Sequence, residues 1–195
     1  MQGQVTGVSG LVVFEPLKYE DDRGFLSETY SRAELKKAGI DVGFVQENHS
    51  FSAMAGTIRG LHFQAPPSAQ AKLIRVVRGS VFDVAVDLRV GSPTYGSWEG
   101  VELSEKRWNQ IFVPAGFAHG FCTLEPETHL VYKVSEPYSL QCEGGVAWDD
   151  PDLAIEWPRM ERYVISEKDR ALPPFSEFVS PFGLSSLPAN EESPS

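Results

Sequence analysis

The stretch Leu73–Val90, LIRVVRGSVFDVAVDLRV, decides the predicted fold because its residues alternate with a period of two. Successive side chains of a β-strand point to opposite faces, so this alternation predicts strands rather than helices. Arg78-Gly79-Ser80 separates two β-branched runs, which is typical of a hairpin turn. The same period places Asp83 and Asp87 on one face. The alternating sets of the second run are Val81, Asp83, Ala85, Asp87 and Phe82, Val84, Val86, Leu88.

Similar short segments continue along most of the chain on both sides of this stretch. Turn residues separate them, among them Gly-Ser-Pro at 91–93 and Pro-Ala-Gly at 114–116. Short strands at close spacing favour a β-sandwich or barrel over alternating strands and helices. The further strands that we expect are Gly10–Phe14, Phe44–Ser52, Thr57–Phe63, Trp98–Leu103, Gln110–Val113, Gly120–Thr123 and Thr128–Val134.

Two serines mark short helices outside the predicted sheets. Ser31-Arg-Ala-Glu34 has the form of a capping box, and Gly39 ends the helix that follows. Ser166-Glu-Lys-Asp169 predicts a second capped turn. We interpret residues 1–182 as a single domain, because a chain of 195 residues fits one sizeable core and is too short for two. The polar, Pro/Ser-rich residues 183–195 are expected to form a frayed tail.

The bulk properties indicate a globular protein of the cytoplasm. The formal charge of −10 argues against binding nucleic acid or an anionic membrane through overall charge, while leaving room for a local basic cluster. No apolar run reaches the roughly 20 residues of a membrane span, and the N-terminus lacks the regions of a signal peptide. Cys122 and Cys142 fit no zinc or CxxC spacing and are expected to be free thiols.

Two of the four histidines stand in glycine-rich, apolar surroundings: His62 in RGLHFQ (59–64) and His119 in PAGFAHGF (114–121). Metal-binding cupins pair a His-x-His and a carboxylate on one strand with a later histidine. Here Phe63-Gln64 follows the first histidine, so its partner is missing, and a metal ion needs three or four converging donors. We therefore expect no metal at this pair.

Two other interpretations remain open at this point. A histidine is the natural base or acid at neutral pH, and it needs an orienting carboxylate and a group that stabilises charge on the substrate. The chain offers candidates for these partners: Lys72, Tyr132, Asp169, Asp83 and Asp87. A lone histidine in an apolar strand is, however, more often a satisfied core residue than a catalyst.

Seven ordered segments give the chain a family resemblance over about residues 5–175. It resembles the dTDP-4-dehydrorhamnose 3,5-epimerases, metal-free cupin-like enzymes of deoxysugar biosynthesis. The resemblance implies an all-β cupin-type jelly roll, or double-stranded β-helix, with a few short peripheral helices and no cofactor. The segments are DDRGFLSETY (21–30), FVQENHS (44–50), IRGLHFQ (58–64), AKLIRVVRGSVFDVAVDLRVGSPTYG (71–96), VPAGFAHGF (113–121), VYKVSEPYSLQCEGGVAWDDP (131–151) and SEKDRALP (166–173).

The resemblance implies four catalytic roles on dTDP-4-dehydro-6-deoxy-D-glucose, whose C4 ketone acidifies the hydrogens at C3 and C5. His62 matches the base that removes them, and Asp169 matches the carboxylate paired with it. Lys72 matches the cation beside the developing charge on O4. Tyr132 matches the acid that returns a proton from the opposite face, giving dTDP-4-dehydro-L-rhamnose. Its presence is expected to favour inversion at both centres.

The resemblance also implies the groups that bind the substrate and a partner subunit. The N-terminal segment of these enzymes reaches into a neighbouring site, so Arg23 and Glu28 are expected to act there in a homodimer. Arginine suits phosphate because its planar fork donates in pairs. The expected substrate-binding residues are Arg23, Glu28, Gln46, Asn48, Arg59, His119, Tyr138, Glu143 and Lys168.

Three alternatives stay beside the double epimerase. A single-centre epimerase or a 3,4-ketoisomerase would use the same scaffold on a dTDP-4-keto sugar. A non-catalytic cupin that binds sugar nucleotides would need no base. A metal-dependent cupin would use His62 and His119 as ligands.

Overall fold

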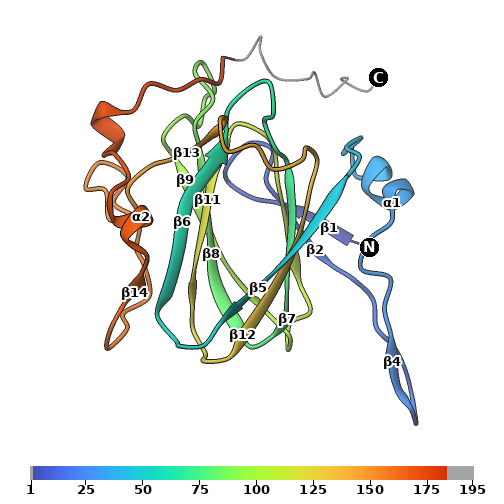
Figure 1. The fold of residues 1–195 in the computed structure, drawn as a ribbon. Helices are drawn as coiled ribbons and strands as arrows, with labels where there is room; N and C mark the ends of the chain where they lie inside the picture. The colour runs from blue at the N-terminus through green and yellow to red at the C-terminus, as the bar shows by residue number, and fades with distance from the viewer. Residues whose placement is uncertain (1, 184–195) are drawn as a thin grey trace.

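The computed structural model describes residues 2–183, which form two facing β-sheets that enclose the core (Figure 1). The all-β jelly-roll prediction is confirmed. The first sheet has the order β1 (Gln2–Val5), β2 (Val12–Glu15), β10 (Gln110–Val113), β7 (Lys72–Arg78), β12 (Thr128–Val134) and β5 (Gln46–Ser52). The second has the order β13 (Glu143–Gly145), β6 (Thr57–Gln64), β11 (Phe117–Thr123), β8 (Ser80–Asp87) and β9 (Trp98–Ser104), with β14 (Val164–Ile165) parallel to β6.

The predicted alternation in β8 corresponds to two buried faces. Val81 and Ala85 point between the sheets, where they pack with Ile74 and Leu103. Phe82, Val84, Val86 and Leu88 lie on the other face, against a cluster that includes Leu153 and Phe182. The C-terminal segment thus covers the outer face of β8. Burying each large aliphatic side chain stabilises the fold by about 1.5–3 kcal/mol, so both faces contribute.

The hairpin predicted at Arg78-Gly79-Ser80 is wrong. β7 pairs with β10 and β12 in the first sheet, whereas β8 pairs with β9 and β11 in the second. Gly79 has a φ of 81°, and a Cβ added there would lie 2.4 Å from Thr128 Oγ1. The turn therefore carries the chain from one sheet to the other, which a local turn signal cannot distinguish from a hairpin.

Both capped helices are present where the serines predict them. Helix α1 (Arg32–Lys37) is capped by Ser31, whose Oγ accepts from the backbone N–H of Glu34 at 3.4 Å. Helix α2 (Glu167–Arg170) is capped by Ser166, whose Oγ accepts from the backbone N–H of Asp169 at 3.1 Å. A 3₁₀ turn, η1 (Phe175–Glu177), follows. Because β14 pairs with β6, helix α2 is held beside β6.

Three smaller predictions concern the cysteines, the C-terminal tail and membrane-spanning helices. Cys122 and Cys142 are both free. The predicted tail lies outside the described residues from 184 onward, and Gly183 bridges to Val90. None of the helices within residues 2–183 has the length and apolar character needed to cross a membrane.

Candidate active site

A cavity of about 520 Å³ opens between the two sheets. Four predicted catalytic residues and two predicted binding residues line its wall, contributed by strands of both sheets and by α2. These six are His62, Lys72, Tyr132, Asp169, Arg59 and His119. The other lining residues are Ser50, Thr57, Ile58, Phe121, Val164, Ile165 and Ser166.

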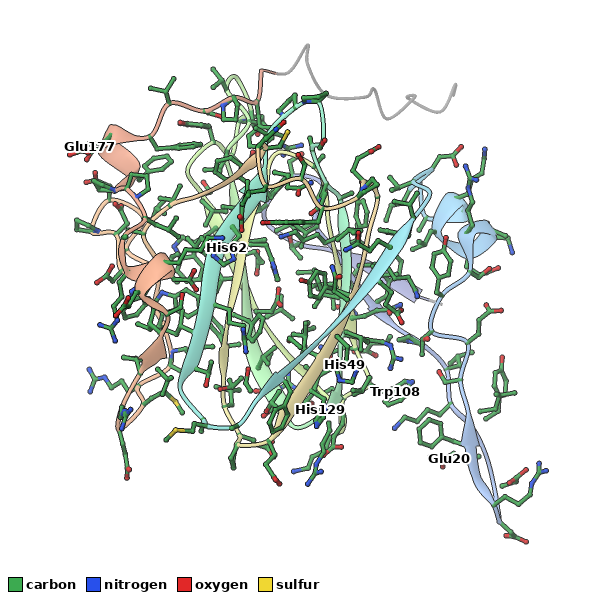
Figure 2. The ribbon with its side chains drawn as sticks, in the orientation of Figure 1. Glu20, His49, His62, Trp108, His129 and Glu177 are labelled. Atoms are coloured by element: carbon green, nitrogen blue, oxygen red, sulfur yellow. The ribbon has the colours of Figure 1, made fainter. Side chains whose placement is uncertain are left out.

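His62 is held by Asp169 within this cavity. Nε2 of His62 lies 2.8 Å from Oδ1 of Asp169, and the second carboxylate oxygen accepts from the backbone N–H of Gly60 at 3.3 Å. Figure 2 shows His62 on β6. Burial lowers the pKa of His62 below 6.5, and the attraction of Asp169 offsets this only in part. The imidazole is therefore neutral at pH 7, which is the form that accepts a proton.

Lys72 brings a buried amine into the cavity from β7 of the first sheet. Its Nζ donates to the backbone carbonyl of His62 at 3.4 Å. Burial lowers the pKa of Lys72 to about 8, against the attraction of Asp83 and Glu143. The amine is therefore mostly protonated at pH 7 and can stabilise a negative charge that develops on a substrate in the cavity.

Tyr132 reaches the cavity from the opposite sheet. It lies on β12, paired in register with Asn48 of β5, whereas His62 lies on β6. Burial raises the pKa of Tyr132 above 10, and its hydrogen bond with Asn48 lowers it by less. The phenol therefore keeps its proton at neutral pH and can act as a donor.

His119 has a carboxylate partner that the sequence analysis did not assign to it. His119 and His62 are paired residues of β11 and β6, yet Nε2 of His119 lies 2.9 and 3.0 Å from the two carboxylate oxygens of buried Asp83. Within residues 2–183, no group of three or more His, Cys, Asp or Glu side chains is arranged to hold a metal ion. His62 and His119 instead each belong to a separate histidine–aspartate pair.

Five of the predicted binding residues form one hydrogen-bonded network outside the cavity wall. Glu143 accepts from Tyr138 Oη at 2.9 Å and from Lys168 Nζ at 2.6 Å. The backbone N–H of Tyr138 donates to Gln46 Oε1 at 3.3 Å, and Gln46 Nε2 donates to Asn48 Oδ1 at 2.8 Å. The charge of Glu143 also contributes to the pKa of His62 and Lys72. The network therefore connects electrostatically with the cavity.

Arg23 and Glu28 do not line the cavity of their own chain. Arg23 stands in the turn between β3 (Tyr19–Asp21) and β4 (Gly24–Leu26), and its side chain is 89% exposed. This two-stranded ribbon projects away from the two main sheets in Figure 1, and Figure 2 labels Glu20 on it. The single chain thus brings together all of the predicted catalytic residues and leaves these two apart.

Sequence reasoning missed Ser50 and the pairing of Asp83 with His119. A signal for Ser50 was present, because Gln46, Asn48 and Ser50 alternate in the segment FVQENHS and so share a face. No comparable signal existed for the Asp83 pair. Its two strands are joined by a long connection, and only the sheet register places them side by side.

Comparison with known proteins decides the family. Residues 5–177 match the dTDP-4-dehydrorhamnose 3,5-epimerase family. The chain belongs to this family. The epimerase of Sinorhizobium fredii is 50% identical over 182 residues, covering 93% of each chain. The Bacillus anthracis epimerase, solved with TDP and pyrophosphate, has a TM-score of 0.86 at 49% identity, covering 89% of this chain and 99% of that one.

Two further solved structures that are similar to this chain bear on substrate and outcome. The Legionella pneumophila epimerase, solved with dTDP-4-keto-L-rhamnose, has a TM-score of 0.88 at 39% identity, covering 96% of this chain and 97% of that one. The Streptomyces bikiniensis protein ChmJ is a 3'-monoepimerase with a TM-score of 0.83 at 33% identity, covering 88% of this chain and 86% of that one. The residues replaced in its double mutant are a histidine and a tyrosine with the same separation as His62 and Tyr132. Tyr132 alone therefore does not distinguish double from single epimerisation.

Proposed function

We propose that this epimerase inverts C3 and C5 of dTDP-4-dehydro-6-deoxy-D-glucose to give dTDP-4-dehydro-L-rhamnose, with His62 and Tyr132 exchanging the protons. One observation carries the proposal. His62, bonded to Asp169 at 2.8 Å, and Tyr132 line a single cavity from opposite sheets. A base and an acid on opposite sides of a sugar ring are the arrangement that inversion requires.

Proton removal falls to His62. The C4 ketone makes the hydrogens on both neighbouring carbons acidic, because the resulting carbanion is delocalised as an enolate. His62 is neutral at pH 7 and takes the proton, and Asp169 then faces an imidazolium that its charge stabilises. The 5% exposure of Asp169 keeps water from screening this attraction.

The enolate oxygen requires a positive charge, and Lys72 supplies it. Its amine donates to the backbone carbonyl of His62 and, with a pKa of about 8, is mostly protonated at neutral pH. Tyr132 then donates its proton to the carbanion from the other side, and the protonation states reset before the second centre reacts. These steps move only protons and electron pairs between the substrate and the chain.

Exposed cationic side chains around the cavity bind the diphosphate. Arg59 lines the cavity, and Lys168 lies in the network outside it. We also propose that the chain forms a homodimer in which Arg23 and Glu28 complete the partner's site. The β3–β4 ribbon supports this, because it carries exposed apolar residues that favour burial against another chain. They are Tyr19 at 63%, Phe25 at 50% and Leu26 at 74% exposure. Location in the cytoplasm stays a prediction from the sequence.

Product analysis tests the function. The protein is incubated with dTDP-4-dehydro-6-deoxy-D-glucose, and the configuration of the sugar ring is determined by NMR. We expect the L-rhamno configuration. Inversion at C3 alone would indicate a monoepimerase like ChmJ. A 3-keto sugar would indicate a ketoisomerase, and binding of the nucleotide sugar without reaction would indicate a non-catalytic module.

A further inference from the structure

Ser50 is a polar residue of the cavity wall that lacks a hydrogen-bond partner. It lies on β5 and its Oγ is buried, yet no group within residues 2–183 forms a hydrogen bond with it. A buried hydroxyl without a partner destabilises a folded protein, because it has lost its bonds to water. Such a group calls for an explanation, and a position on the wall of a substrate cavity offers one.

The other polar residues on this face of β5 are all bonded within the protein. Gln46 donates to Asn48, and Asn48 is hydrogen-bonded to Tyr132. Ser52, which is 3% exposed, accepts from Arg59 Nε at 3.4 Å. Ser50 stands between Asn48 and Ser52 in this row and is the exception. Ser50 and Ser52 lie on the same face of the same strand, two positions apart, yet only Ser52 has a hydrogen-bond partner in the described part of the chain.

The neighbours of Ser50 indicate which part of the substrate it meets. On one side, Asn48 is paired in register with Tyr132, the proposed proton donor to the sugar. On the other side, Ser52 and the carbonyl of Phe51 accept from Arg59, the proposed phosphate ligand. Ser50 thus lies between the group that acts on the sugar ring and the group that binds the diphosphate.

We propose that Ser50 is a substrate-binding residue whose Oγ forms a hydrogen bond with an oxygen between the reacting carbons and the diphosphate. Two sources supply such an oxygen: a hydroxyl of the sugar ring or a phosphate group. This inference rests on the proposed function, since it takes its substrate from there. It adds a polar contact from β5 to the substrate-binding residues.

The test compares Ser50→Ala with Ser52→Ala. Tm is measured for both free proteins, and the affinities for dTDP and for dTDP-glucose are measured by calorimetry. dTDP-glucose lacks the ketone and therefore cannot react. Because Ser50 Oγ has no protein partner, Ser50→Ala should keep or slightly raise the Tm. Ser52→Ala should lower it, because it removes a bond to Arg59 and opens a buried site.

The binding measurements separate the two sources of the oxygen. If Ser50 meets a sugar hydroxyl, Ser50→Ala should weaken dTDP-glucose binding by about 2- to 10-fold and leave dTDP binding unchanged. If it meets a phosphate, both ligands should lose about 10-fold or more, because that hydrogen bond involves a charge. Unchanged affinity for both ligands would overturn the proposal, and so would a fall in Tm equal to that of Ser52→Ala.

Measuring turnover of the wild-type protein distinguishes a failure of the Ser50 proposal from a failure of the proposed function. A wild-type chain that epimerises the 4-keto sugar, together with a Ser50→Ala variant that binds normally, would refute the role of Ser50 alone. A wild-type chain that leaves the 4-keto sugar unchanged would refute the proposed function.

Discussion

His62 and His119 are paired in register on the neighbouring strands β6 and β11, yet their rings are bonded to different carboxylates. His62 is bonded to Asp169 at 2.8 Å, and His119 to Asp83 at 2.9 Å. A carboxylate bonded to one ring nitrogen fixes the orientation of the ring. The two histidines that look like halves of a metal site in the sequence are therefore anchored separately. His62 is left as the base of the proposed reaction.

Replacing His62 by alanine tests the base directly. We expect turnover of the 4-keto sugar to fall by about 10²–10⁴-fold, because the variant has no group positioned to take the proton. The affinity for dTDP, measured by calorimetry, should stay within a few-fold of the wild type. His49→Ala is the matched control, since His49 is exposed and bonded to His129 away from His62 (Figure 2). An equal loss of turnover in the control would contradict the assignment.

Asp169→Asn should shift the pH profile in a defined direction. His62 acts as a base only when unprotonated, so kcat/KM falls as the pH drops through its pKa, which lies below 6.5. The charge of Asp169 raises that pKa, so its removal should move the acidic limb to lower pH while reducing kcat. The measurement is kcat/KM between pH 4.5 and 8. A limb that moves to higher pH would refute the pairing.

Lys72 should set the alkaline limb of the profile. Its pKa of about 8 means that the cation is progressively lost as the pH rises through that value, and activity should fall with it. Lys72→Met should reduce kcat by about 10²–10³-fold. Lys72→Arg keeps the charge at all accessible pH values, so whatever activity it retains should show no limb near pH 8. Persistence of that limb in the arginine variant would assign it to another group.

Tyr132→Phe should separate proton removal from inversion. The variant keeps the ring and loses the proton donor, so the carbanion should be reprotonated mainly from the His62 side. In deuterated water we expect the recovered substrate to gain deuterium while inverted product forms at least about 10²-fold more slowly. Tyr95→Phe is the control, because Tyr95 packs on Phe175 outside the cavity wall. Normal inversion by the Tyr132 variant would remove tyrosine from the mechanism.

Subunit mixing tests the proposed homodimer. Arg23→Ala and His62→Ala should each be weakly active alone. A mixed dimer would contain one site that combines His62 of the first variant with Arg23 of the second. Dissociating and reassociating equal amounts should therefore restore activity well above the sum of the separate variants. The measurement is turnover before and after mixing, with light scattering to establish the oligomeric state. No gain from a confirmed mixed dimer would place Arg23 outside the partner's site.

The sequence was sufficient for features encoded locally. The period of two in β8 and the capping serines at Ser31 and Ser166 predicted strands and helices that the structure contains. The turn at Gly79 was misassigned, because a tight turn has the same local signal whether it joins strands of one sheet or of two. The pairing of Asp83 with His119 depends on register between distant strands, which neither residue encodes alone.

Deuterium incorporation by the wild-type protein tests the central claim most directly. The protein is incubated with dTDP-4-dehydro-6-deoxy-D-glucose in deuterated water, and the deuterium at each ring carbon is determined by NMR and mass spectrometry. The account predicts a product that carries solvent deuterium at both C3 and C5, each with inverted configuration. Deuterium at C3 alone, or product formed without any solvent deuterium, would contradict it.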